Sequence, residues 1–190
     1  YDFNLRNTIV VQRNEDGADY FINAGKTSQR GIEAYLSYDI INYDAPMSLF
    51  RAWASYAYQH YRFKEYAPLD TDYSGNALTG VAPTIFSGGI DVNVKKQISA
   101  NVTVNYVDQI PLNDANTAFA ESYVLLGLRA GWNTPFRHTS RLQIFAGVDN
   151  ALKEIYSLGN GLNAFGGRYY NAAMPRNYYA GLSVVLGYGK

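Results

Sequence analysis

The side chains best suited to ligand chemistry fall in two long polar segments of the chain. They are Tyr66 and Tyr73 in residues 64–82, and Arg168 and Tyr169 in residues 151–173. Tyrosine rings stack and hydrogen-bond, and a guanidinium pairs with anionic groups, so these four residues form a candidate binding set. Tyrosine, asparagine and glycine also decorate ordinary exposed loops. The sequence leaves both interpretations open.

Neither catalysis nor a resident metal or cofactor is predicted. A Ser-His-Asp arrangement needs its members within hydrogen-bond reach, and the pattern brings no serine and carboxylate to His60 or His138, the two histidines. Asp70 and Asp72 lack the ligand count and turn glycine of a calcium site. Because the chain has no cysteine, thiolate sites and disulfides are excluded. We therefore expect a binding protein and not an enzyme.

Composition narrows the class of protein further. The 190 residues contain 16 Lys+Arg and 16 Asp+Glu, a net charge of zero that provides no field to attract nucleic acid. No run approaches the roughly 18 consecutive apolar residues of a membrane-spanning helix. The 18 Tyr, 9 Phe and 2 Trp favour strands over helices. The chain is predicted to be all-β.

Alternating apolar and polar side chains indicate about eight strands. The clearest alternation places Ile32, Leu36 and Ile40 on one face and Glu33 and Asp39 on the other. The predicted strands cover residues 3–12, 32–40, 50–59, 86–94, 100–106, 124–132, 141–149 and 177–186.

Connection lengths distinguish a barrel from a sandwich. Long polar connections at 13–26, 64–82, 108–121 and 151–173 alternate with short ones at 41–47, 95–97 and 134–139. In an antiparallel up-and-down meander this places all long loops at one end, as in a transmembrane β-barrel of the outer membrane. A Greek-key sandwich would mix long and short connections.

Aromatic side chains on the apolar face form two bands, as expected where a barrel wall meets water at two interfaces. The bands are Tyr38, Phe50, Trp132 and Tyr188 near the short turns, and Tyr58, Phe86, Tyr106 and Tyr178 near the long loops. Cross-strand aromatic pairs on an ordinary sheet are the alternative, but they do not require two bands. We therefore expect the apolar face to contact outer-membrane lipid.

Several motifs resemble those of TonB-dependent outer-membrane receptors. They are the segment Asn23–Tyr38 with its Gly31 and Glu33, Gly80–Pro83 before a strand, Phe145–Tyr156, Gly167–Tyr170, and Met174–Gly181. Their order and spacing together are similar to the family over nearly the whole chain.

The resemblance implies that residues 1–190 are the C-terminal part of a 22-stranded barrel, without plug domain or TonB box. It implies energy-coupled uptake of a ferric siderophore across the bacterial outer membrane, with the TonB complex as partner through the missing N-terminal part. Tyr66, Tyr73, Arg168 and Tyr169 would then contact cargo, with Arg168 supplying charge for an anionic chelate. Cobalamin or an oligosaccharide are alternative cargoes. A self-contained eight-stranded barrel, acting as an anchor or adhesin, is the alternative architecture.

Overall fold

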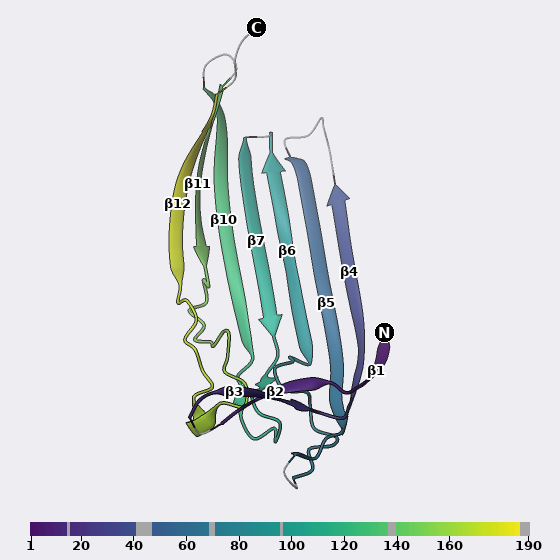
Figure 1. Cartoon of the computed structure of the whole chain (residues 1–190). Helices are drawn as coiled ribbons and strands as arrows, with labels where there is room; N and C mark the ends of the chain where they lie inside the picture. Colours follow the sequence, from purple (N-terminus) through teal and green to yellow (C-terminus); the bar gives the residue numbers. More distant parts are fainter. Residues whose placement is uncertain (15, 41–46, 69–70, 96, 137–139, 187–190) are drawn as a thin grey trace.

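Long antiparallel strands make up most of this computed structural model (Figure 1), which describes residues 1–190 except 15, 41–46, 69–70, 96, 137–139 and 187–190. Asp70, His138 and Tyr188 therefore lie outside the described residues. The described part of the chain contains no helical segment with the length and hydropathy of a membrane span. A short 3-10 turn, η2, spans Phe165–Gly167.

Eight strands pair in one antiparallel sheet in the order β1-β4-β5-β6-β7-β10-β11-β12. Their bounds are β1 Asp2–Arg6, β4 Lys26–Ile40, β5 Met47–Glu65, β6 Thr84–Val94, β7 Ile98–Val107, β10 Tyr123–Phe136, β11 Ser140–Asp149 and β12 Asn177–Val185. Two small hairpins are separate, β2 (Ile9–Arg13) with β3 (Asp19–Asn23) and β8 (Ile110–Pro111) with β9 (Phe119–Ala120). The up-and-down antiparallel topology predicted from the sequence is confirmed.

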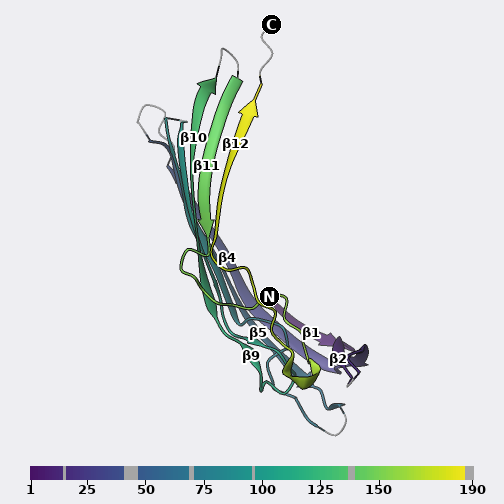
Figure 2. The same cartoon turned by 90° about the vertical axis from the view of Figure 1, so that its left-hand side faces the viewer.

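The sheet is curved and open, because β1 and β12 each pair with a single neighbour. Figure 2 shows the bend from the side, with the β2–β3 hairpin and the 151–173 connection on the concave side. The eight strands therefore do not close on themselves, in contrast to the alternative of a self-contained barrel.

The first predicted strand, residues 3–12, is wrong as a single element. The chain breaks at Asn7, whose φ of 57° lies in the left-handed region that asparagine tolerates. The backbone N–H of Asn7 donates to the carbonyl of Gly25 at 2.6 Å, and Ala24 donates to Thr8 at 2.7 Å. Only β1 therefore joins the wall, whereas β2 leaves it to pair with β3.

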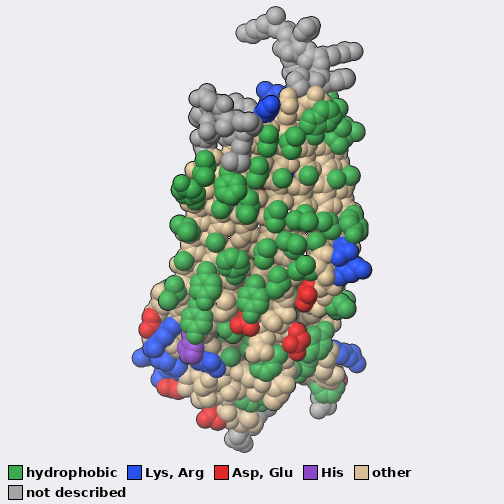
Figure 3. All heavy atoms as spheres, turned by 180° about the vertical axis from the view of Figure 1, so that it is seen from behind, with side chains coloured by type: hydrophobic (Ala, Val, Ile, Leu, Met, Phe, Trp, Pro, Cys, Tyr) green, Lys and Arg blue, Asp and Glu red, His purple; other side chains and the backbone are tan. Residues whose placement is uncertain are grey.

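The register confirms the two predicted faces. Ile32 pairs with Tyr58, and Ile144 pairs with Leu182. The apolar residues of neighbouring strands thus meet on the convex side, where Figure 3 shows a broad band of hydrophobic side chains. Leu36 and Leu182, 73% and 68% exposed, are typical of this band. Such exposure is stable only when hydrocarbon replaces water outside the wall.

The concave face carries polar side chains that pair across strands. Arg51 forms a bidentate ion pair with Asp39, with both N–O distances at 2.7 Å. Asn101 donates to Asp91 at 2.5 Å, and the guanidinium of Arg129 lies 4.3 Å from the centre of the Phe145 ring. These contacts link neighbouring strands, so the mixed charges of this face have a structural explanation.

Two glycines of the concave face leave room for aromatic rings. A Cβ atom at Gly147 would clash with the Tyr179 ring, and one at Gly181 would clash with the Phe145 ring. Both glycines therefore leave space for the ring of a residue on the neighbouring strand.

A charge introduced in the middle of the convex face is expected to destabilise the wall. Leu126→Arg or Val184→Arg places a guanidinium in hydrocarbon and should cost about 2–4 kcal/mol of unfolding free energy in a bilayer. Ser183→Arg, on the concave face, is the matched control and should cost far less. Equilibrium unfolding in lipid vesicles measures the difference, and equal losses at Val184 and Ser183 would contradict the assigned faces.

Candidate functional site

The four long connections lie at one end of the sheet, as the alternation of lengths predicts (Figure 1). There the β2–β3 hairpin crosses the concave side of the wall, and a cavity of about 570 Å³ opens between it and the connections. The cavity is lined by Gln12, Tyr20, Ile22, Asn23, Gly25, Glu65, Tyr66, Ala67, Pro68, Thr71, Tyr73, Asn113, Asp114, Ala115 and Asn163.

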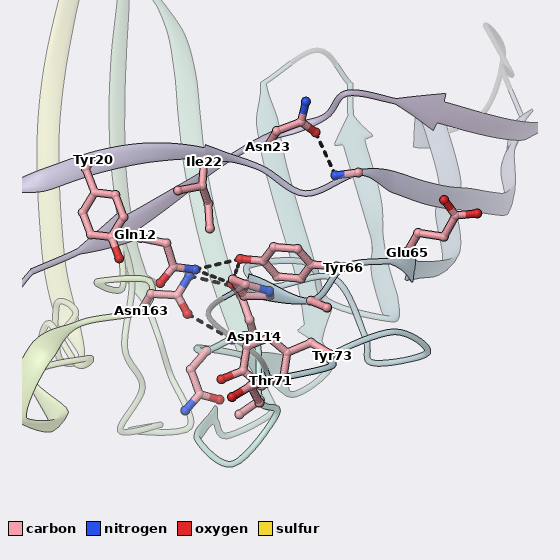
Figure 4. Close-up of a pocket in the computed structure, with 15 residues that line it drawn as sticks. Gln12, Tyr20, Ile22, Asn23, Glu65, Tyr66, Thr71, Tyr73, Asp114 and Asn163 are labelled. Atoms are coloured by element: carbon pink, nitrogen blue, oxygen red, sulfur yellow. Dashed lines mark hydrogen bonds between the residues drawn. The ribbon is translucent and has the colours of Figure 1, made fainter.

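Asp114 is the centre of this site, although it is only 2% exposed. One carboxylate oxygen accepts hydrogen bonds from the Gln12 amide at 2.5 Å and the Tyr66 hydroxyl at 2.8 Å (Figure 4). The other accepts from the Thr79 hydroxyl and from the Asn163 amide at 3.2 Å. A buried carboxylate is stable only when its oxygens are satisfied in this way. Asp114 therefore joins the β2–β3 hairpin and three long connections.

Hydrogen bonds between asparagine side chains and backbone groups stabilise the same junction. The Asn163 side chain accepts from the Asp114 backbone N–H at 3.0 Å and donates to the Val11 carbonyl at 3.0 Å. The Asn76 amide donates to the Asp114 carbonyl at 2.8 Å. These asparagines hold the backbone of three segments around one carboxylate, so the connections are packed structure and not independent surface loops.

A local turn between β8 and β9 orients the Asp114 side chain. The side-chain oxygen of Asn113 accepts from the backbone N–H of Thr117 at 2.9 Å. Asn116 has a φ of 53°, and its N–H donates to the Asn113 carbonyl at 3.0 Å. This asparagine-rich turn between β8 and β9 directs the carboxylate toward the hairpin.

The site rests on the main buried apolar cluster, formed by Ala24, Phe63 and Tyr66 at 0%, 1% and 3% exposure. The Tyr66 ring lies 4.6 Å from the Phe63 ring and 5.8 Å from the Tyr73 ring, measured between centroids. Val10, Ile22 and Leu78 pack against the same cluster. Tyr66 is thus held by packing on its ring and by hydrogen bonds at its hydroxyl.

Burial raises the pKa of the Tyr66 hydroxyl above its ordinary value, and the hydrogen bond to Asp114 raises it further. The neutral phenol donates to the carboxylate, whereas a phenolate would face it with like charge. Tyr66 therefore stays a hydrogen-bond donor throughout the physiological pH range.

The charged side chains that line the cavity are acidic. Among the described residues that line it, the charged side chains are Glu65 and Asp114, and none is lysine or arginine. Glu65 accepts from the Lys26 ammonium at 2.5 Å. The wall that this chain contributes therefore offers hydroxyls, amides and aromatic rings, and suits a ligand held by hydrogen bonds and stacking.

The structure brings two of the four predicted site residues together. Tyr66 and Tyr73 both line the cavity, and their rings are in contact. Arg168 is exposed and lies outside the lining. Tyr169 is also outside it, and its hydroxyl accepts from the amide of Asn113, a lining residue, at 3.4 Å. Cargo contact by all four stays a prediction.

Sequence reasoning missed Gln12 and Asp114. Gln12 lies at the end of a predicted wall strand, and Asp114 is one of several loop carboxylates. The asparagine-rich run around Asn113 and Asn116 is a turn signal, but it does not tell which side chain becomes buried. Asp72 and His60, the described residues that were tested above as a metal ligand and a catalytic group, have ordinary structural roles. Asp72 accepts from the Ser74 N–H at 2.8 Å, and His60 is exposed on the convex face.

Comparisons with known proteins agree with this architecture. Residues 1–151 match the family described as TonB dependent receptor-like, beta-barrel. The fold is similar to the siderophore receptor PiuA from Acinetobacter baumannii, with a TM-score of 0.65 and 19% identity over 96% of this chain and 24% of that one.

Two further solved structures show the same likeness. The ferric preacinetobactin receptor BauA from Acinetobacter baumannii has a TM-score of 0.69 and 15% identity over 96% of this chain and 26% of that one. The ferric-catecholate import receptor Fiu from E. coli K12 has a TM-score of 0.60 and 17% identity over 96% of this chain and 23% of that one. The chain therefore spans about a quarter of the length of these structures.

Removal of the central carboxylate should loosen the connections together. Asp114→Ala leaves the buried hydroxyl of Tyr66 and the part-buried amides of Gln12 and Asn163 without their acceptor, which should cost roughly 2 kcal/mol of local stability. Amide hydrogen exchange should then accelerate about thirtyfold in residues 64–82, 108–121 and 151–173 at once. Asp72→Ala, an exposed carboxylate bonded only within its own turn, is the control. Faster exchange confined to residues 108–121 would contradict the shared junction.

The raised pKa of Tyr66 predicts a distinct alkaline titration. Stabilisation by the neutral hydroxyl is fully present below the ordinary tyrosine pKa of about 10 and is lost as the pH rises through the higher folded-state value. The tyrosinate absorbance that Tyr66→Phe removes should therefore appear above the pH at which exposed tyrosines ionise. Tyr20→Phe, which removes an exposed hydroxyl, is the control. A normal midpoint for Tyr66 would mean that the hydroxyl is not buried against Asp114.

Proposed function

The chain belongs to the TonB-dependent receptor-like β-barrel family, and from this premise we propose that it is part of a receptor that takes up a ferric siderophore. Proteins of this family are receptors and transporters of the bacterial outer membrane and not enzymes. The membership accounts for the apolar convex face, the polar concave face and the long connections at one end.

The unpaired edges of the sheet support the larger architecture. The outer side of β12, and the side of β4 that β1 leaves uncovered over residues 32–40, carry backbone N–H and C=O groups that have no strand partner among the described residues. Such groups are costly at membrane depth, because hydrocarbon offers no hydrogen bonds. We therefore propose that residues 1–190 form the C-terminal part of a larger barrel that other strands complete. A coupling partner such as the TonB complex would act through a separate N-terminal part.

The observation that carries the cargo proposal is the cavity on the concave side at the loop end, built on the Asp114 junction. Tyr20, Tyr66 and Tyr73 contribute rings, and Gln12 and Asn113 contribute amides. A siderophore complex presents carbonyl and oxygen-ligand groups on a compact surface, which such side chains recognise. Arg168 is proposed to contact anionic parts of the cargo from outside this lining.

Cells that lack the gene for the full-length protein are expected to lose uptake of at least one ferric chelate. The measurement is accumulation of radioactive iron supplied as individual siderophore complexes under iron limitation, and re-expression of the gene should restore it. Normal uptake of every iron chelate would overturn the cargo assignment. Uptake assays with cobalamin and with oligosaccharides would then identify the cargo.

A variant of the cavity tests whether this site takes part. Tyr73→Ala in the full-length receptor removes a ring that makes no hydrogen bond to Asp114, and should weaken cargo binding about tenfold while the barrel stays folded. Tyr170→Ala removes an exposed loop tyrosine outside the lining and should bind as the wild type does. Equal affinity of the Tyr73→Ala receptor and the wild type would exclude the cavity, even if uptake depends on the gene.

A further inference from the structure

Three hydroxyl groups line the cavity without serving the Asp114 junction. They belong to Tyr20 on β3 and to Thr71 and Tyr73 in the connection after β5 (Figure 4). No described residue is hydrogen-bonded to these hydroxyls, whereas the Tyr66 hydroxyl is engaged with Asp114. Each free hydroxyl donates one hydrogen bond and accepts others. The cavity therefore offers a ligand neutral hydrogen-bonding groups beside aromatic rings.

The lining of the cavity contains no lysine, arginine or histidine among the described residues. In the four long connections, the residues outside the described ranges are Glu15, Leu69 and Asp70, and none of these is basic. Arg168, which is proposed to contact cargo, is exposed and outside the lining. The wall that this chain contributes thus provides no ion pair for an anionic ligand inside the cavity.

The four long connections are acidic as a group. Together they contain ten Asp and Glu but five Lys and Arg, although the whole chain has 16 of each kind. Two of the five basic residues are compensated, Arg13 by Asp19 at 2.6 Å and Lys26 by Glu65 at 2.5 Å. A cleft surrounded by charge of one sign attracts ligands of the opposite sign and repels ligands of its own sign. The loop end of this chain therefore disfavours the approach of a polyanion.

Asp114 adds a negative charge to the same cavity. Its carboxylate has no ion-pair partner among the described residues, and its hydrogen bonds come from neutral amides and hydroxyls. Such donors stabilise the carboxylate but do not cancel its net charge. Because charges interact strongly where water is partly excluded, a multiply anionic ligand in this cavity would be repelled. A neutral or cationic ligand avoids that repulsion.

We propose that the cavity selects ferric chelates of neutral or positive net charge, of the trihydroxamate type, over ferric tris-catecholates. This inference rests on the proposed function and specifies its cargo. Three hydroxamates, each with a single negative charge, neutralise ferric iron, whereas three catecholates leave a triple negative charge. The hydroxamate oxygens remain acceptors for the hydroxyls of Tyr20, Thr71 and Tyr73. Contact of Arg168 with such an oxygen does not require a net negative charge on the cargo.

The test uses the full-length receptor in detergent and one linear trihydroxamate loaded with radioactive ferric iron. Its single terminal amine is left free, acetylated or succinylated, so that the three probes share one iron centre and are cationic, neutral and anionic. Equilibrium binding to immobilised receptor gives the affinity of each probe. The wild type is expected to bind the succinylated probe about tenfold more weakly than the probe with the free amine. A ferric tris-catecholate should bind more weakly than the neutral probe, also by about tenfold or more.

A pair of hydroxyl deletions links this preference to the cavity. Tyr20→Phe/Tyr73→Phe keeps both rings and should weaken binding of the neutral trihydroxamate about tenfold, since each lost hydrogen bond has a severalfold effect. The control is Tyr38→Phe/Tyr58→Phe, which removes two hydroxyls from the convex face and should bind as the wild type does. Heat-modifiable gel mobility confirms that both double variants are folded.

The outcomes separate this inference from the proposed function. Binding of the tris-catecholate or of the succinylated probe as tightly as the neutral probe would overturn the charge selection, while the receptor would still be a siderophore receptor. Wild-type affinity of Tyr20→Phe/Tyr73→Phe for the trihydroxamate would overturn the cavity as its site. If no ferric hydroxamate, catecholate or carboxylate chelate bound to the receptor, the proposed function would itself fail, and this inference with it.

Discussion

Backbone hydrogen bonding in hydrocarbon is the constraint on which the rest of this structure depends. Every N–H and C=O at membrane depth needs a partner, and only a neighbouring strand supplies one. Eight strands therefore pair edge to edge, and pairing stops at the outer sides of β1 and β12 and along residues 32–40 of β4, which β1 does not reach. The two-residue repeat of side chains then separates a surface for lipid from a surface for the interior of a barrel.

A wall of this kind buries few side chains, so the packed part of the molecule lies elsewhere. The most buried residues, such as Phe63, Leu112 and Asp114, are at the loop end. There the chain leaves the membrane constraint, and turns, hydrogen bonds and a small apolar cluster determine its conformation. The Asp114 carboxylate accepts hydrogen bonds from several segments at once, and so joins them where no large apolar core is present. The cavity is a consequence of that junction, because its wall comes from the same segments.

Along one strand, the convex face changes from apolar side chains to basic side chains. On β5, Tyr56 and Tyr58 belong to the apolar band, and His60, Arg62 and Lys64 follow at the same two-residue interval. A single geometric repeat thus presents hydrophobic groups at one depth and basic groups at the next.

Local periodicity in the sequence was sufficient to determine the seven wall strands after the first, their faces and the end at which the long connections emerge, because each of these follows from neighbours along the chain. The sequence also showed the family resemblance. Two of the site residues that it indicated, Tyr66 and Tyr73, line the same cavity. The break at Asn7 required a partner, Gly25, that periodicity does not reveal. Only the tertiary structure decided that Gln12 meets Asp114, since a buried carboxylate obtains its donors from segments that are distant in sequence and adjacent only after the connections pack.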